Sequence, residues 1–304
     1  MMKAAFIVKG TINRKEKFLR DVDLLKQKAF FDTIEIFETQ RKLHAIELAK
    51  DATEKGFSHV IAIGGDGTNN EVLNGIMQAN TEALPVMGCL PYGSANDFVL
   101  SAGLNDDIHQ FIQLIEQNKS KRIDIGKVDF QGKEGLPVTR YYMNISDIGL
   151  GGYTVEKMGK TKPVFGTAFT FFRVILESFL TYKKTPLRCF NDSFNWEGKS
   201  LMLVVANGNF FGNGLCVAPD AKLDDGKLNL VILGDVSTFD YIKNLGNLKK
   251  CRKIQHPEVS YHKIESIEVD SGDHPCPIDM DGEFIGYGPA TFSVVPKKVE
   301  FLMP

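Results

Sequence analysis

Apolar residues follow two different patterns along the chain, one before Arg122 and another after it. In the first part, short apolar runs alternate with longer segments in which apolar residues recur at helical spacing. Such runs are typical of buried parallel strands, and the longer segments predict amphipathic helices. Strands that alternate with helices predict a doubly wound parallel sheet, whose ligands bind beyond the carboxyl ends of the strands. The predicted strands are residues 3–9, 33–37, 60–63 and 84–90, and the predicted helices are residues 15–29, a segment opened by Thr39, a segment after Thr68 and residues 109–117.

From Arg122 onward, short runs of alternating apolar and polar residues replace this pattern. A period of two predicts antiparallel strands, and the dipeptides Asp225-Gly226 and Asp281-Gly282 are typical of hairpin turns. The expected fold class is therefore α/β plus all-β. We place the boundary near Lys133, with one domain at residues 1–133 and a β-rich domain at residues 134–304. The predicted strands of the second part are residues 123–125, 127–130, 140–145, 200–206, 227–233, 264–269 and 291–295.

The most informative segment is the turn Gly64-Gly65-Asp66-Gly67, which separates a predicted strand from a predicted helix. Glycine lets the backbone come close to a bulky anion, and a helix N-terminus offers free N–H groups, so the expected ligand is a phosphate. The carboxylate of Asp66 would repel a phosphate, which suggests that it faces a metal ion, a water or a hydroxyl. The alternative is an ordinary tight turn with a capping aspartate. Residues 10–14 and 91–97 end neighbouring strands, so the three turns can converge on one site.

Composition and charge narrow the class of protein. The 304 residues carry a formal charge of −2, which argues against a nucleic-acid binder that depends on phosphate contacts. The five cysteines form no CxxC pair, so we expect neither a zinc ribbon nor a disulfide framework, and a cytoplasmic location. The apolar run at the N-terminus is too short for a signal peptide. Residues 163–182 are rich in Phe but include Arg173 and Glu177, which favours an amphipathic helix, buried between domains or touching lipid, over a membrane span.

Five motifs in order resemble the diacylglycerol kinase catalytic family, and in particular its soluble bacterial lipid kinases. A single Gly-Gly-Asp-Gly-Thr turn is only moderately specific, because NAD kinases and phosphofructokinases have similar turns. The combination covers nearly the whole chain and is highly specific. The motifs are residues 64–68 with Glu71, Asn74 and Gly75; residues 90–98, with Ser94 where Thr is usual; Thr39 with His44-Ala45; residues 206–208 with 219–228; and Asp279-Met280-Asp281-Gly282-Glu283.

The resemblance implies transfer of the γ-phosphate of ATP to a lipid hydroxyl, with diacylglycerol as the expected acceptor. The nucleotide would lie in a cleft between an N-terminal nucleotide domain and a C-terminal antiparallel β-sandwich, and the last strand would pack back on the first domain. Peripheral contact with a membrane surface and a homodimer are also expected. One motif departs from the family pattern: the first turn lacks the usual Asn-Pro and reads Gly10-Thr11-Ile12-Asn13-Arg14.

Phosphoryl transfer depends mainly on positioning and charge neutralisation, and the chain has no Walker A lysine motif. Mg²⁺ is the expected partner of the triphosphate, with Asp66 as its first candidate ligand. Thr39 is assigned to the ribose or base. Backbone N–H groups and short polar side chains are assigned to the rest of the nucleotide, and these are Gly10, Thr11, Asn13, Gly64, Gly65, Gly67, Thr68, Asn69, Asn70, Glu71 and Ser94.

The terminal acidic motif is the candidate for the general base. Asp281 and Glu283 either share one side of a strand or straddle a hairpin turn. Either carboxylate could accept the proton of the lipid hydroxyl, and we favour Glu283 with Asp281 beside it. The resemblance also implies a structural Mg²⁺ at the acidic turn 222–227, bound by the Asp225 carboxylate and the carbonyls of Lys222 and Lys227.

Two alternatives from other functional classes are considered. An NAD kinase has a similar glycine turn, but the segments 91–98 and 219–226 argue against it. A non-catalytic protein that binds nucleotide or lipid would not need Asp66, Asp281 and Glu283.

Overall fold

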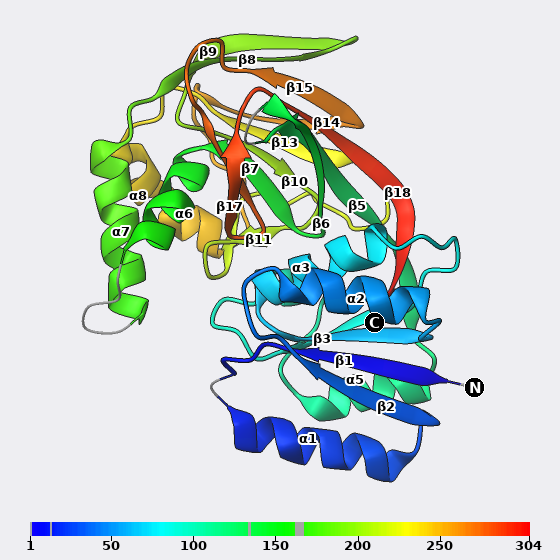
Figure 1. Cartoon of the computed structure of the whole chain (residues 1–304). Helices are drawn as coiled ribbons and strands as arrows, with labels where there is room; N and C mark the ends of the chain where they lie inside the picture. The colour runs from blue at the N-terminus through cyan, green and yellow to red at the C-terminus, as the bar shows by residue number, and fades with distance from the viewer. Residues whose placement is uncertain (1, 13, 133–134, 162–166) are drawn as a thin grey trace.

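A computed structural model describes residues 2–12, 14–132, 135–161 and 167–304, with residues 167–169, 171 and 172 described by backbone alone. The chain folds into two bodies joined by one long strand (Figure 1). The predicted boundary at Lys133 lies outside the described residues. The predicted Asn13 lies outside them as well, and so do residues 163–166 of the Phe-rich segment.

The N-terminal body contains the predicted parallel sheet, with strand order β2-β1-β3-β4. Apolar side chains of α2 and α3 cover one face, and those of α1 and α5 cover the other, so the sheet is doubly wound. The elements are β1 (Lys3–Val8), α1 (Lys15–Lys28), β2 (Thr33–Glu38), α2 (His44–Glu54), β3 (His59–Gly64), α3 (Asp66–Met77), β4 (Val86–Pro91), α4 (Asp97–Ser101) and α5 (Ile108–Glu116).

The C-terminal body is a β-sandwich. One layer is a sheet of six antiparallel strands in the order β14-β13-β10-β7-β16-β17. Its strands are β7 (Ile145–Gly149), β10 (Met202–Ala206), β13 (Leu228–Leu233), β14 (Val259–Ile264), β16 (Pro277–Met280) and β17 (Glu283–Tyr287). The other layer contains β5 (Ser120–Gln131), β6 (Pro137–Tyr142), β8 (Thr185–Asn191), β9 (Phe194–Ser200), β15 (Ser266–Asp270) and β18 (Ala290–Leu302).

Buried side chains from both layers, such as Phe292 and Leu203, share one core. The helices α6 (Leu150–Lys160), α7 (Thr167–Thr181) and α8 (Thr238–Lys249) and the short hairpin of β11 (Phe210–Phe211) and β12 (Leu215–Cys216) complete the body. The predicted fold class, a parallel α/β body followed by an antiparallel sandwich, is confirmed.

Strand β18 connects the two bodies. Its first part pairs with β5 and β15 in the sandwich, and Phe301 near its end pairs with Met87 of β4. The ring of Phe301 also packs edge-on against that of Phe98, with 5.1 Å between centroids. The chain therefore returns to the N-terminal body and adds a strand beside β4 (Figure 1).

Several predicted boundaries are wrong, each for a tertiary reason. The second helix begins at His44 rather than Thr39, because the Glu71 carboxylate of α3 accepts from the N–H groups of Leu43 and Ala45, and Leu43 has a positive φ of 64°. Residues 140–145 form two strands, since the N–H groups of Met143 and Asn144 donate to Asp281 instead of continuing a ladder. Residues 264–269 also divide, because β14 and β15 belong to different layers.

The turn at Asp225-Gly226 is not a hairpin. It leads into β13, whose partners β10 and β14 are not joined through it. The expectation of no disulfide is also wrong, since Cys216 and Cys251 form one, with their Cα atoms 4.8 Å apart. These cysteines are 35 residues apart in sequence, so spacing alone did not indicate the pair.

Candidate active site

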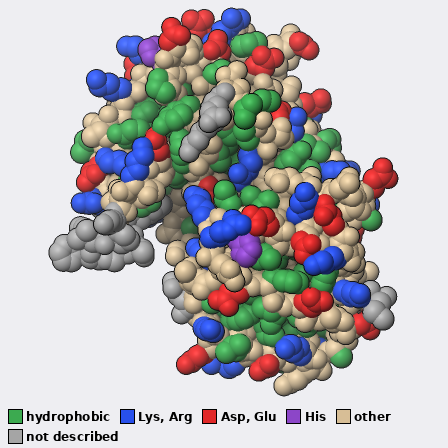
Figure 2. All heavy atoms as spheres, in the orientation of Figure 1, with side chains coloured by type: hydrophobic (Ala, Val, Ile, Leu, Met, Phe, Trp, Pro, Cys, Tyr) green, Lys and Arg blue, Asp and Glu red, His purple; other side chains and the backbone are tan. Residues whose placement is uncertain are grey.

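A cleft of about 1030 Å³ lies where the two bodies meet. Lysine and arginine side chains gather on the visible face along this junction (Figure 2). The lining comes from the turns at the carboxyl ends of β1, β3 and β4 on one side and from β16, β17, α6 and the β11–β12 hairpin on the other. Most of the predicted site residues line it, and these are Gly10, Thr11, Thr39, Gly64, Gly65, Asp66, Gly67, Thr68, Glu71, Ser94, Asp281 and Glu283.

Two glycine turns touch each other at the base of the N-terminal wall. The carbonyl of Gly64 accepts hydrogen bonds from the N–H groups of Tyr92 (2.7 Å) and Gly93 (2.9 Å). A Cβ on Gly93 would lie only 2.3 Å from the Cα of Gly65, so the contact between the turns leaves no room for a side chain at position 93. The backbone is thereby exposed to the cleft next to the N-terminus of α3, where the first N–H groups have no partner inside the helix.

Asp66 opens α3 but does not point along the helix. Its Oδ1 accepts from the Phe98 N–H (3.1 Å), at the start of α4. Burial raises the pKa of Asp66, and the nearby charge of Asp97 acts in the same direction. A buried carboxylate at this edge has the chemistry of a Mg²⁺ ligand, because a divalent cation would relieve its charge.

Three predicted nucleotide residues, Thr68, Asn70 and Glu71, have structural contacts that the sequence did not indicate. Thr68 is buried beneath Gly64, where a Cβ would come within 2.3 Å of the Thr68 hydroxyl. Asn69 and Asn70 are buried as well and do not line the cleft. Asn70 donates to the carbonyl of Tyr141 (3.0 Å) and so ties α3 to the C-terminal body. Glu71 accepts from the N–H groups of Leu43 and Ala45 (both 3.1 Å) and thereby caps α2.

The first turn is held by Thr39, whose hydroxyl accepts from the N–H of Gly10 (3.0 Å). A Cβ on Gly10 would lie 2.1 Å from the Thr39 carbonyl oxygen, so the two segments are in backbone contact. This contact holds the atypical first turn, which lacks the usual Asn-Pro. Thr11 and Thr39 both line the cleft.

Asp281 is the first residue of a two-residue hairpin turn between β16 and β17. It has φ 49° and Gly282 has φ 84°, as a type I′ turn requires. Both carboxylate oxygens are buried and engaged. They accept from the side chain of Asn70 (3.0 Å) and from the N–H groups of Met143 (3.1 Å), Asn144 (3.2 Å) and Ile145 (2.9 Å).

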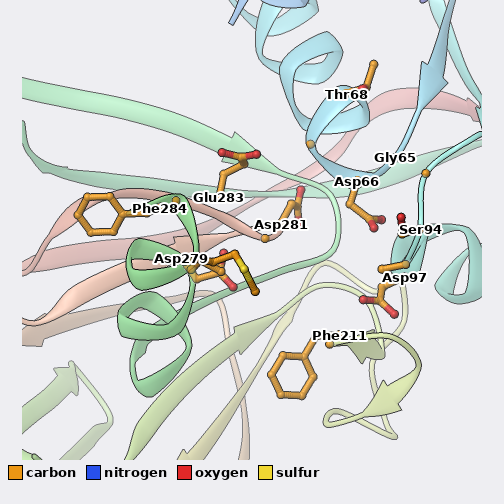
Figure 3. Close-up of a pocket in the computed structure, with 18 of the residues that line it drawn as sticks. Gly65, Asp66, Thr68, Ser94, Asp97, Phe211, Asp279, Asp281, Glu283 and Phe284 are labelled. Atoms are coloured by element: carbon orange, nitrogen blue, oxygen red, sulfur yellow. The ribbon is translucent and has the colours of Figure 1, made fainter. Parts of the chain in front are cut away.

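Burial raises the pKa of Asp281 to about 6, although these hydrogen bonds oppose the rise. Asp281 thus joins α3 to the C-terminal body. Glu283 follows the turn, so the two acids lie on either side of Gly282 rather than along one strand. Figure 3 shows both of them opposite Asp66, Ser94 and Asp97.

Glu283 is the less constrained acid. Its side chain is 40% exposed, and Oε2 forms an ion pair with Lys42 Nζ at 2.6 Å. A Cβ on Gly67 would meet Glu283 Oε1 at 3.2 Å. The carboxylate therefore lies directly beside the first turn of α3.

Sequence reasoning did not single out Lys42 or Asp97. Asp97 belongs to the motif of residues 90–98, which by itself indicates no role for this side chain. Its carboxylate accepts from the N–H groups of Asn213 (3.0 Å) and Gly214 (2.7 Å), which fixes the β11–β12 hairpin at the mouth of the cleft. Burial raises the pKa of Asp97.

A second pair of acids, Asp147 and Asp279, was also missed. The two residues face each other across β7 and β16, and both are buried at the edge of the cleft. Asp147 Oδ1 accepts from the N–H of Gly152 (3.2 Å), near the start of α6. Burial raises the pKa of Asp147 to about 7, against the opposing effect of hydrogen bonds that include one with Asp279, and burial and the charge of Asp147 raise the pKa of Asp279 well above its usual range. Both shifts favour a form of the pair that retains a proton.

The predicted metal residues lie outside the cleft. Asp225 Oδ2 pairs with Lys263 Nζ (2.6 Å), and the Lys227 ammonium pairs with Glu265 (2.6 Å). Buried Asp124 accepts from the Gly226 N–H (2.6 Å) and fixes the turn on β5. Over the described part of the chain, no group of three or more His, Cys, Asp or Glu side chains is placed to hold a metal. A cation bound by Lys222, Asp225 and Lys227 stays a prediction that rests on one carboxylate and two carbonyls.

Family models match both bodies. The diacylglycerol kinase catalytic domain matches residues 4–128, and the model described as the YegS C-terminal NAD kinase beta sandwich-like domain matches residues 152–303. Among curated relatives, a diacylglycerol kinase of Staphylococcus haemolyticus is 30% identical, over 100% of this chain and 89% of the relative. Another, of Staphylococcus saprophyticus, is 31% identical, over 100% and 96%.

Solved structures show the same fold. A diacylglycerol kinase from Bacillus anthracis superposes with a TM-score of 0.73 at 19% identity, covering 99% of this chain and 97% of that one. Yeast NADH kinase superposes with a TM-score of 0.52 at 10% identity, covering 99% and 82%. At these identities the structures share the fold alone. The family models and curated relatives confirm the resemblance found in the motifs: this chain is a kinase of the diacylglycerol kinase family.

Proposed function

We propose that this kinase transfers the γ-phosphate of ATP, with Mg²⁺, to the hydroxyl of a lipid, with diacylglycerol as the expected acceptor. One observation carries the proposal. The carboxylate of Glu283, from the C-terminal body, lies beside Gly67 in the first turn of α3. A candidate proton acceptor and a candidate phosphate cradle thus meet at one place, as in-line transfer between a nucleotide and a hydroxyl requires.

The N-terminal wall fits the phosphates. The two glycine turns in contact expose their backbone, and the N-terminus of α3 provides N–H groups and a positive dipole end. Mg²⁺, when bound, would neutralise phosphate charge. Asp66 is the residue we assign to it, because its carboxylate is buried in the same wall.

The far end of the cleft fits an acyl chain. Apolar side chains of α6, α7, α8 and β11 line it, among them Val155, Ile175, Phe179, Phe211 and Tyr241. Mostly apolar walls with a few polar groups at one end are typical of sites that hold an amphipathic ligand. These residues support a lipid acceptor whose hydroxyl lies at the acidic end. Peripheral membrane contact and a homodimer also stay proposals.

The test is transfer of label from [γ-³²P]ATP to a panel of lipid alcohols in mixed micelles, with and without Mg²⁺. Wild type and Asp66→Ala are compared, and NAD is included as an alternative acceptor. We expect Mg²⁺-dependent label in diacylglycerol that the variant loses. Label in NAD, or label in no lipid under conditions where ATP binds, would contradict the proposal.

A further inference from the structure

Two neighbouring helices of the C-terminal body carry large apolar side chains on their outer surfaces. On α7, Leu176 and Leu180 are 45% and 72% exposed, and on α8, Phe239 and Ile242 are 73% and 53% exposed. Spacings of four and three residues place each pair on one side of its helix. We call these four side chains the α7–α8 face.

The helices that carry the two pairs are in contact with each other. The rings of Phe179 and Tyr241, next in sequence to exposed members of the face, lie 4.4 Å apart between centroids. The Thr238 hydroxyl donates to the Phe179 carbonyl (3.4 Å), which fixes the end of α7 against the start of α8. Apolar side chains clustered on a protein surface are typical of an interaction site.

The inner sides of the same helices reach the cleft. Ile175 and Phe179 of α7 and Tyr241 of α8 line its apolar end. A molecule that covers the α7–α8 face is therefore separated from the proposed acyl-chain site by one layer of helices. We take a lipid bilayer as the molecule that covers the face. The proposed lipid acceptor has to leave a bilayer to enter the cleft, so a face next to the acyl-chain site would shorten its path.

The charge around the face favours a bilayer with anionic lipids. Residues 173–184 and 235–253 together carry eight Lys and Arg but three Asp and Glu, although the whole chain has a formal charge of −2. Lys243 and Lys249 of α8 are exposed near Ile242. Long basic side chains can extend to lipid phosphates while apolar neighbours enter the interface.

We propose that the α7–α8 face docks on an anionic membrane surface and presents the apolar end of the cleft to the bilayer. The inference rests on the proposed lipid acceptor. Docking, however, is a binding event that can be measured without turnover, so the two proposals can fail separately.

The experiment is co-sedimentation of the full chain with vesicles of phosphatidylcholine, alone or mixed with phosphatidylglycerol. Leu180→Glu/Phe239→Glu removes the apolar contact. The matched control, Leu19→Glu/Leu136→Glu, changes two leucines that are 51% and 62% exposed elsewhere, on α1 and before β6. Lys243→Glu/Lys249→Glu tests the charge. Circular dichroism and light scattering check the fold and the oligomeric state of each protein.

We expect wild type and the matched control to bind the mixed vesicles, and the α7–α8 variant to bind at least about tenfold more weakly. The lysine variant should lose its preference for phosphatidylglycerol. Turnover of a short-chain, water-soluble diacylglycerol should be the same in all four proteins. If wild type did not phosphorylate this substrate, the proposed function would be contradicted and not the docking proposal. Equal vesicle binding by wild type and the α7–α8 variant, or a dimer that only this variant loses, would overturn the docking proposal.

Discussion

Lys42 and Glu283 are 241 residues apart in sequence, yet their side chains form an ion pair at 2.6 Å. Lys42 belongs to the loop before α2, and Glu283 begins β17, so the pair spans the cleft from one body to the other. The same carboxylate lies beside Gly67 at the start of α3. A group that the C-terminal body contributes is thus already in position against the proposed phosphate site.

This position predicts a selective effect for Glu283→Gln. If Glu283 accepts the proton of the acceptor hydroxyl, turnover should fall by about 10²–10³-fold. The free energy of unfolding should change by less than about 1 kcal/mol, because the side chain is partly exposed and has one surface ion pair. Steady-state kinetics and urea denaturation measure the two effects. Lys42→Met is the control, since it breaks the same ion pair but keeps the acid. An equal loss of turnover in both variants would contradict the assignment of Glu283 as base.

Asp281→Ala should act on stability as well as on activity. Four buried donors, from Asn70, Met143, Asn144 and Ile145, would lose their acceptor. Unpaired buried donors are costly, so we expect a loss of about 3–5 kcal/mol in the free energy of unfolding. Urea denaturation, compared with Glu283→Gln, measures the difference. An Asp281→Ala protein as stable as wild type would show that the network does not hold the bodies together.

Gly93→Ala should impair nucleotide binding more than Gly67→Ala does. A Cβ on Gly93 would lie 2.3 Å from the Cα of Gly65, and backbone at that distance has to move. A Cβ on Gly67 meets only the end of a flexible side chain, at 3.2 Å. We expect the KM for ATP to rise at least about tenfold in Gly93→Ala and less than about threefold in Gly67→Ala. A smaller effect in Gly93→Ala than in Gly67→Ala would show that the contact between the turns does not shape the phosphate site.

The acid pair predicts a dependence of stability on pH. Burial raises the pKa of Asp147 to about 7 in the folded chain, above its unfolded value of about 4. The folded state then binds more protons between these two pH values, so stability falls as pH rises through this range. Of the other titratable neighbours, Tyr182 and Cys276 also have raised pKa values and stay neutral there, whereas Asp281, with a pKa of about 6, titrates in the same range.

Asp147→Asn removes this titrating group and leaves Asp279, whose pKa burial raises well above its usual range, as the one acid of the pair. Relative to wild type, the variant should therefore gain stability on going from pH 5 to pH 8, with a relative rise in Tm of about 5 °C. Thermal denaturation across this range measures the gain, and exposed Asp192→Asn is the control. A constant difference between the variant and wild type over this range would contradict a shared proton.

The disulfide predicts a stability that depends on reductant. Cys216 and Cys251 close a loop of 35 residues, and closing a loop of this length stabilises a fold by about 3–4 kcal/mol. Cys251→Ser should be less stable than wild type by that amount without reductant, and equal to it with dithiothreitol. Denaturation under both conditions measures this. An oxidised wild type that reductant does not destabilise would show that the bond does not form in solution.

The local pattern of apolar residues and glycines was sufficient to predict the parallel sheet and its glycine turn. Residues 60–63 are a short apolar run, and the two glycines and the helical repeat that follow it favour a buried strand. The Asp281-Gly282 turn was likewise readable, because a two-residue hairpin turn of this type requires a positive φ at both positions. The motifs, taken together, were enough to identify the family.

The tertiary structure alone decided what each polar residue contacts. Nothing local indicates that Glu71 caps α2, that Asn70 donates to Asp281, or that Asp147 faces Asp279, because these partners come from segments far apart in the sequence. The ion pair of Lys42 with Glu283 depends in the same way on how the two bodies meet. Hydrophobic periodicity reports which side of an element is buried, and only packing determines which buried or cleft-facing groups become neighbours.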